Sequence, residues 1–263
     1  MSDQSATRAA LSATGELPNH TFFHLLEKRG SCRDFKSDPL PEGWVEAIIA
    51  AGQRAPSSSN HQVYSIIVVR DPETKAKFAK IAGDQQHIID CPVFFALCAD
   101  QTVAEYAAQL HGMDFVGNTL EKGLVAAVDV ALVGMTMSLA ADALGLGSVM
   151  IGAMRNDPLE VARILKLPPK VFVVFGLCIG WPRSAPIPKP RLPMEAIVHQ
   201  EVWGNANRDQ AVAAYDQELA RHYRDQGRDT PDAAWSYTTA EKYNLKRRLE
   251  LRQQLTRLGF PME

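Results

Sequence analysis

The sequence predicts an α+β protein with a core over residues 20–195 and a helical extension over residues 196–263. Two observations support this fold class. Short apolar runs rich in β-branched residues alternate with helical patterns as far as about residue 180, which is typical of a sheet covered by helices. Beyond Pro193 the sequence becomes charged but keeps a helical spacing, so we expect helices outside the core. Residues 1–19 are polar and predict a flexible lead-in.

The composition is that of a soluble globular protein. Of 263 residues, 46% are hydrophobic and 22% are charged, and the formal net charge is −2. This balance predicts no nucleic-acid partner and no membrane partner. The polar segment Met1–Pro18 lacks the apolar stretch of a signal peptide, so we expect a cytoplasmic protein. The four cysteines contain no C-x-x-C pair and predict small buried thiols, with no metal site.

The elements of the first half of the core follow from apolar periodicity. Residues 22–27 suit a short helix. Residues 41–54 predict an amphipathic helix because apolar residues recur at i, i+4 and i+7. The β-branched run 64–69 predicts a strand and residues 73–82 a short helix. Residues 92–99 are apolar throughout, which predicts a strand at the centre of the sheet.

The second half of the chain begins with the longest predicted helix, residues 123–144. Because this helix is apolar on most faces, we expect it to be buried in the core or at a subunit interface. Residues 157–165 predict a helix with an aspartate N-cap followed by proline. The remaining predicted elements are the strands 148–151 and 171–179 and the charged helices 210–224 and 240–258.

Two strings carry positive charge suited to a phosphate group. In the first, Arg29 and Arg33 enclose Gly30 and Ser31, which supply charge, a hydroxyl donor and close backbone approach. By itself this string is also typical of a solvated surface patch. In the second, Lys189 and Arg191 alternate with prolines in a stiff extended segment, so little backbone freedom is lost when they grasp an anion.

Three further strings suit a flat polar ligand. Hydroxyls and amides can bond a sugar or a ring edge, and small residues let a ring lie against backbone. The residues are Ser57, Ser58 and Ser59; Gln85 and His87; and Met150, Ile151, Gly152 and Ala153. Each string alone is equally typical of an ordinary polar turn or of packing. The chain has no G-x-G-x-x-G after a strand, no Walker loop, no HExxH and no G-x-S-x-G, so hydrolysis and phosphoryl transfer have no supporting motif.

Taken in order, these strings resemble the FMN-dependent nitroreductases, in the branch of the oxygen-insensitive nitroreductase A and the NADPH:flavin oxidoreductases. The resemblance runs from about Phe22 to Trp203 and is most specific between Leu144 and Pro193. It implies a nitroreductase-like fold, with a central, mostly antiparallel sheet flanked by helices. It also implies a homodimer in which residues 196–263 wrap the partner subunit.

The resemblance implies roles for the residues named above. Arg29, Gly30, Ser31 and Arg33 would bind the FMN phosphate and ribityl chain, and Lys189 and Arg191 the phosphate or the pyrimidine edge of the flavin. Ser57, Ser58 and Ser59 would line the ring and ribityl region. Gln85 and His87 would face the ring edge, while Met150, Ile151, Gly152 and Ala153 would lie behind the ring. The loop that reads the NADPH 2′-phosphate is arginine-rich in close relatives and here offers Arg228, which leaves NADPH and NADH both open as donors.

The implied activity is two-electron transfer from NADPH or NADH through FMN to nitroaromatics, quinones or related planar acceptors. No catalytic acid or base is expected among the side chains, because solvent can supply the protons. Two alternatives remain: a flavin reductase that supplies reduced FMN to a partner monooxygenase, and a flavin-binding protein without enzymatic activity.

Overall fold

The computed structural model describes residues 21–204, 207–228 and 234–263, and these form two compact units. One unit consists of Ser31–Pro186 and Arg248–Glu263, and the other of the described residues up to Gly30 together with Ile187–Arg247. The predicted lead-in over residues 1–19 lies outside the described residues. The predicted division into a core over residues 20–195 and a partner-wrapping extension over residues 196–263 stays a prediction.

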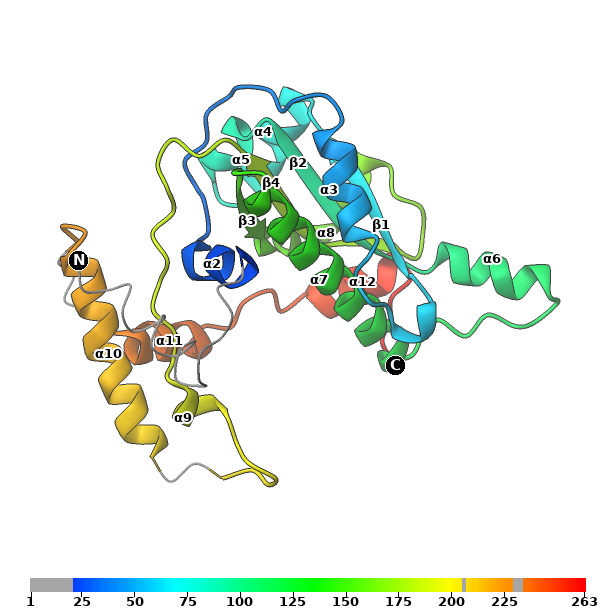
Figure 1. Ribbon diagram of the computed structural model, residues 1–263. Helices are drawn as coiled ribbons and strands as arrows, with labels where there is room; N and C mark the ends of the chain where they lie inside the picture. Colours follow the sequence, from blue (N-terminus) through cyan, green and yellow to red (C-terminus); the bar gives the residue numbers. More distant parts are fainter. Residues whose placement is uncertain (1–20, 205–206, 229–233) are drawn as a thin grey trace. The chain divides into compact units, whose positions relative to one another are not determined.

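The larger unit, Ser31–Pro186 with Arg248–Glu263, is built on a four-stranded sheet in the order β1-β2-β4-β3. The strands are β1 (Tyr64–Val69), β2 (Val93–Asp100), β3 (Gly147–Ile151) and β4 (Val171–Gly180). All three pairings are antiparallel, which confirms the predicted sheet (Figure 1). Strand β2 lies inside the sheet and is buried along its whole length, as its apolar sequence predicts.

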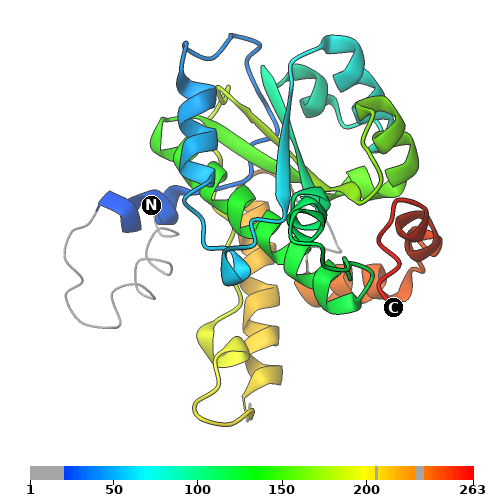
Figure 2. The same cartoon turned by 90° about the vertical axis from the view of Figure 1, so that its right-hand side faces the viewer.

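Alternation along β2 divides the core into two layers. Val93, Phe95 and Leu97 join one cluster of buried residues, and Phe94 and Ala96 join the other, because successive side chains of a strand point to opposite faces. The first layer is covered by α3 (Trp44–Gly52) and α7 (Leu120–Ala143), and the second by α4 (Pro72–Ile81) and α5 (Gln86–Asp90) (Figure 2). The sheet is therefore enclosed on both faces. Helix α8 (Pro158–Leu165) contributes to both layers and has the predicted cap, Asp157, which accepts from the Glu160 amide.

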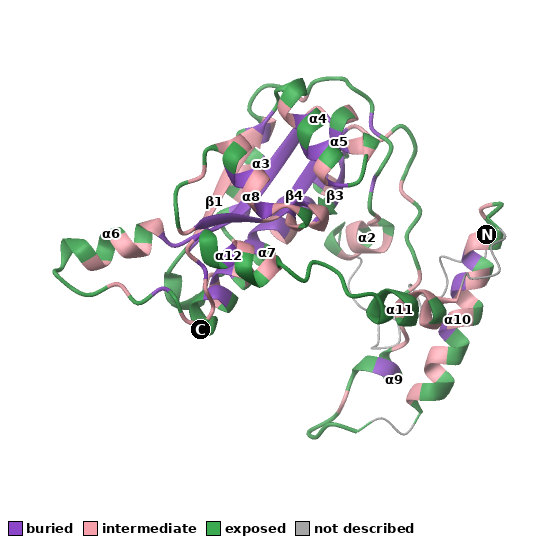
Figure 3. Ribbon diagram, turned by 180° about the vertical axis from the view of Figure 1, so that it is seen from behind, coloured by how far each residue is buried: buried purple, intermediate pink, exposed green. Residues whose placement is uncertain are grey.

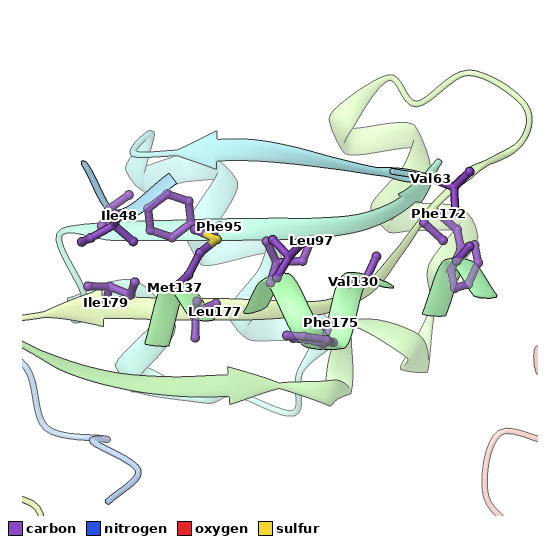
Figure 4. Close-up of a cluster of buried hydrophobic side chains, with 14 of the residues drawn as sticks. Ile48, Val63, Phe95, Leu97, Val130, Met137, Phe172, Phe175, Leu177 and Ile179 are labelled. Atoms are coloured by element: carbon purple, nitrogen blue, oxygen red, sulfur yellow. The ribbon is translucent and has the colours of Figure 1, made fainter. Parts of the chain in front are cut away.

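Helix α7 begins after Thr119, whose side chain accepts a hydrogen bond from the Lys122 amide. Figure 4 shows Val130 and Met137 of this helix lying against side chains of β2 and β4. Among the described residues α7 is the one helix long and apolar enough to cross a membrane, by length and composition only. Its inner face is instead part of the core, as the sequence predicts. The outer face carries large apolar side chains that are exposed in the single chain: Leu120, Leu124, Val128 and Leu132.

Three predicted helices differ from the structure, the first being α7, which begins at Leu120 rather than at residue 123. Helix α3 begins at Trp44 rather than residue 41, because Gly43 adopts a left-handed conformation with φ of +80° just before it. The single helix predicted over residues 240–258 is two helices, α11 (Trp235–Asn244) and α12 (Leu251–Arg257). The segment between them is not helical, and Arg248 within it has a φ of +53°. Helix α12 belongs to the larger unit, where Leu255 and Phe260 pack in the core.

The smaller unit consists of helices around one long amphipathic helix, α10 (Arg208–Arg224). The others are α2 (Thr21–Lys28), α9 (Met194–Ile197) and α11. Tyr215 and Leu219 of α10 are buried, and the Tyr215 ring lies 5.9 Å from that of Trp235 at the start of α11. Most of this unit is intermediate or exposed, whereas β2 and β4 of the larger unit are almost wholly buried (Figure 3).

Helix α6 (Thr102–Leu110) follows β2 and has no buried residue. The four cysteines are free and buried, as predicted, and burial together with the charge of Asp100 raises the pKa of Cys98 to about 12.

Candidate functional site

The edge strand β3, on which the Met150–Ala153 string begins, lies beside Ser31 and Cys32 of the first arginine string. Ser31 forms a parallel bridge with Ser148, and the Cys32 amide donates a 2.9 Å hydrogen bond to the Ser148 carbonyl. This approach depends on Gly147, since a Cβ there would lie 2.6 Å from the Cβ of Cys32. The segment Ser31–Arg33 therefore runs beside β3, whose last residues are Met150 and Ile151.

The imidazole of His87 keeps hydrogen-bonding capacity that no described residue uses. Its Nε2 atom is buried and has no partner among the described residues. Burial, and then the positive charge of Arg33, lower the pKa of His87 against the opposing effect of Asp90. The imidazole is therefore neutral at neutral pH, and it can donate to or accept from a ligand according to its tautomer. Arg33 and His87 thus lie within electrostatic reach of each other, although 54 positions separate them (87 − 33).

Gln85 and the residues after β3 present mainly backbone and amide groups. The Gln85 side-chain amide donates a 2.9 Å bond to the Ala82 carbonyl, which fixes the side chain and leaves its carbonyl oxygen with acceptor capacity. Ile151 is 2% exposed as a whole residue, so it offers a ligand little surface. Gly152 and Ala153 begin a 3-10 turn, η2 (Gly152–Asn156), and are half-buried.

The serine loop is held by a residue of α7. The Ser57 hydroxyl donates a 2.8 Å bond to Asp129 and accepts a 2.7 Å bond from the Gln62 amide. The Ser58 amide donates a 3.0 Å bond to the same carboxylate. The hydroxyl of Ser57 is thus engaged within the protein, whereas Ser58 and Ser59 are exposed in the 3-10 turn η1 (Ser58–Asn60).

The smaller unit gathers three of the predicted phosphate ligands around one cavity of about 520 Å³. Arg29 at the end of α2 lines it together with Lys189 and Arg191 of the proline-rich segment. Glu27, Glu195 and Glu218 also lie in its wall, so the cations are set among carboxylates. Arginine and lysine converging from separate segments are the groups that bind a phosphate.

Two tyrosines of α10 position the proline-rich segment. Tyr215 donates a 2.8 Å hydrogen bond to the Pro190 carbonyl, and Lys189 Nζ donates a 2.8 Å bond to the Tyr223 hydroxyl. Arg228 also lies over the Tyr223 ring, 5.3 Å from its centroid, and Lys189 Nζ is 5.2 Å from the same centroid. The candidate reader of the NADPH 2′-phosphate and a candidate phosphate ligand of FMN therefore share one aromatic ring.

The predicted residues thus fall into three groups in two units. Ser31, Arg33, His87 and the end of β3 meet at the sheet edge, the Ser57–Ser59 loop lies on α7, and Arg29, Gly30, Lys189, Arg191 and Arg228 belong to the smaller unit. Sequence reasoning did not identify Asp129, Tyr215 or Tyr223. An acidic residue within an apolar helix was the visible signal for Asp129, since a buried charge needs partners.

Two family models together cover most of the chain, and both describe the same family. Residues 26–181 match the model of the nitroreductase family, and residues 189–263 match that of the nitroreductase family C-terminal domain. These matches confirm the resemblance seen in the sequence.

Individual relatives give the same result. The chain is 38% identical over 243 residues to an FMN reductase [NAD(P)H] from Bacillus subtilis, covering 90% of this chain and 97% of the relative. It is 37% identical over 217 residues to an oxygen-insensitive NADPH nitroreductase from Salmonella typhimurium, covering 81% and 86% of the two chains. Among solved structures, the NADPH:FMN oxidoreductase from Vibrio harveyi complexed with NAD⁺ superposes with a TM-score of 0.84 at 30% identity, covering 93% of this chain and 100% of that one.

Proposed function

This chain belongs to the nitroreductase family, and from that premise we propose that it is an FMN-dependent oxidoreductase that takes electrons from NAD(P)H and reduces nitroaromatics, quinones or related planar acceptors. The observation that carries the proposal is the cavity where Arg29, Lys189 and Arg191 converge. These are the residues for which the sequence predicts contact with the FMN phosphate.

The residues present fit such a cofactor in two further respects. The buried Nε2 of His87, without a partner among the described residues, would bond a polar ring edge. The exposed Ser58 and Ser59 would bond the ribityl chain or the ring, while Ser57 holds their loop. Ser31 and Arg33 beside β3 would add a hydroxyl and a positive charge.

When bound, FMN supplies a two-electron carrier between a nicotinamide and a planar acceptor. The protein would contribute position and electrostatics. Positive charge from Arg33 and a hydrogen bond donated by His87 would favour electron density on the ring, while the Gln85 carbonyl oxygen would accept from a ring N–H. Because solvent can deliver the protons, no side chain need act as general acid or base.

The protein would act as a cytoplasmic homodimer. The apolar row Leu120, Leu124, Val128 and Leu132 on the outer face of α7 is exposed in the single chain and would be covered by a second copy. We place the flavin at this subunit interface, since α7 also holds the Ser57–Ser59 loop.

A flavin reductase that releases reduced FMN to a monooxygenase is the second candidate. It is favoured by the 38% identity to an FMN reductase [NAD(P)H]. The two candidates differ in whether free FMN is a substrate or a retained cofactor.

The deciding experiment measures NADH and NADPH oxidation with nitroaromatic, quinone, azo and free-flavin acceptors. We expect ping-pong kinetics with nitro or quinone acceptors and FMN retained through purification. Turnover with free flavin alone, by protein that loses its FMN on a desalting column, would favour the flavin reductase. No acceptor-dependent oxidation of either nucleotide would refute both candidates.

A further inference from the structure

Asp129 is a charged residue in the middle of the apolar helix α7, and its residue surface is fully buried. Its two carboxylate oxygens accept from the Ser57 hydroxyl and from the Ser58 amide, at 2.8 and 3.0 Å. Both donors belong to the serine loop, 72 and 71 positions away in the sequence. The buried carboxylate therefore accepts both of these hydrogen bonds from one short loop.

The same contact reaches the far end of the loop. The Ser57 oxygen that donates to Asp129 also accepts from the Gln62 amide at 2.7 Å, and the Gln62 side chain donates to the Asn60 carbonyl. Ser59, Asn60 and Gln62 have φ angles of +48°, +59° and +53°, a region that residues other than glycine rarely adopt. Residues persist in this strained conformation where the hydrogen bonds and packing around them hold the backbone in place.

We propose that Asp129 is a positioning residue for flavin binding: it fixes the Ser57–Gln62 loop in the conformation that presents Ser58 and Ser59 to the cofactor. This inference rests on the proposed function, since it assumes that the loop contacts FMN. The reason for a charge at this place is that a carboxylate can accept from a hydroxyl and an amide at once. An apolar side chain would fit the surrounding core without the cost of burying a charge, but would leave both donors unsatisfied.

Asp129 also lies on the helix that carries the proposed subunit contact. Its neighbour Val128 is 54% exposed on the outer face of α7, while Asp129 faces inward. A second copy packed on Leu124 and Val128 would steady the helix that carries the carboxylate.

The test compares Asp129→Asn with a matched control, Asp100→Asn. Asp100 is also buried and also accepts from a serine hydroxyl and a backbone amide, but its partners are Ser65 and Thr102, outside the loop. For each variant one measures FMN dissociation by fluorescence quenching, the visible circular dichroism of bound FMN, and the melting temperature. Amide hydrogen exchange of residues 58–62 is measured in flavin-free protein.

We expect Asp129→Asn to weaken FMN binding about tenfold, because the two donors bond different carboxylate oxygens and asparagine replaces one of these oxygens by an NH2 group, which cannot accept. It should also alter the flavin dichroism and speed exchange at residues 58–62. Asp100→Asn should lower the melting temperature while keeping wild-type flavin affinity and dichroism. If Asp129→Asn lowers only the melting temperature, like the control, the residue is structural and the inference is wrong.

The same titration also tests the proposed function. If the wild-type protein does not bind FMN, both the proposed function and the role of Asp129 in flavin binding are wrong. If Asp129→Asn does not fold, Ser57→Ala carries the test. That variant keeps the bond from Ser58 to Asp129 and should show faster exchange at Gln62 with a smaller loss of FMN affinity. Exchange and affinity equal to those of wild type would overturn the inference.

Discussion

Lys189 Nζ donates a 2.8 Å hydrogen bond to the hydroxyl of Tyr223, so a flexible cation in the proline-rich segment is held by a residue of α10. Lys189 lines the cavity that also contains Arg29 and Arg191. A lysine fixed in this way loses less conformational freedom when it binds a phosphate. Lys189 is therefore where the phosphate prediction is tested most simply.

Lys189→Ala should weaken FMN binding roughly 10- to 150-fold, since a lost charge-assisted hydrogen bond costs about 1.5–3 kcal/mol. Arg33→Ala should act in the same direction. Tyr223→Phe keeps the ring under Lys189 and should have a smaller effect. Arg163→Ala, which removes an exposed arginine paired with Glu160, serves as the control. Equal FMN affinity in wild type and Lys189→Ala, measured by fluorescence quenching, would show that the phosphate binds elsewhere.

Arg228→Ala should raise KM for NADPH more than KM for NADH. The two nucleotides differ only in the 2′-phosphate, and Arg228 lies on the same Tyr223 ring as Lys189. The measurement is the ratio of kcat/KM values for the two donors in wild type and variant. An unchanged ratio would assign Arg228 to the solvated surface.

Acidification should destabilise the protein partly through His87. Its pKa in the folded state lies below the value of about 6.5 typical of unfolded chains. As the pH falls through that range, the unfolded chain takes up the proton first, so the free energy of unfolding decreases; above it the contribution is constant. His87→Gln should reduce the loss of stability between pH 7.5 and 5.5 in urea denaturation. His111 is exposed, and His111→Gln should lose as much stability as wild type between pH 7.5 and 5.5. If His87→Gln also loses as much stability as wild type, His87 does not contribute to the destabilisation by acid.

Charge on the outer face of α7 should prevent the proposed homodimer from forming. Leu124→Glu with Val128→Glu places two carboxylates in the exposed apolar row, where burial against a second copy would be costly. Light scattering should give twice the 29.0 kDa chain mass for wild type and a single chain mass for the variant. Lys122→Glu, on the same helix, should remain dimeric. Truncation of residues 240–263 is a poorer test, because Leu255 and Phe260 pack in the core.

The sequence predicts the ends of the strands to within about one residue because apolar runs leave little choice of structure. The sequence does not predict helix α6, because its apolar residues do not mark a buried face. Val103 and Tyr106 are both exposed. The break between α11 and α12 was missed because the helical spacing of residues 240–258 continues through it. What interrupts that helix is tertiary: Leu255 and Phe260 join the core of the other unit.

The candidate site was predictable as residue types but not as an arrangement. Ser57 illustrates the limit, because its sequence suggests a ligand contact whereas its hydroxyl is bonded to Asp129 and Gln62. No local pattern joins residues 72 positions apart. The sharing of Tyr223 by Lys189 and Arg228 depends in the same way on the packing of α10.

FMN binding by this chain is decided by the flavin content of the purified protein together with its titration by FMN. We expect yellow protein with about one FMN per chain, and flavin-depleted protein that quenches the fluorescence of added FMN to the same stoichiometry. Colourless protein that leaves the fluorescence of added FMN unchanged would contradict this expectation.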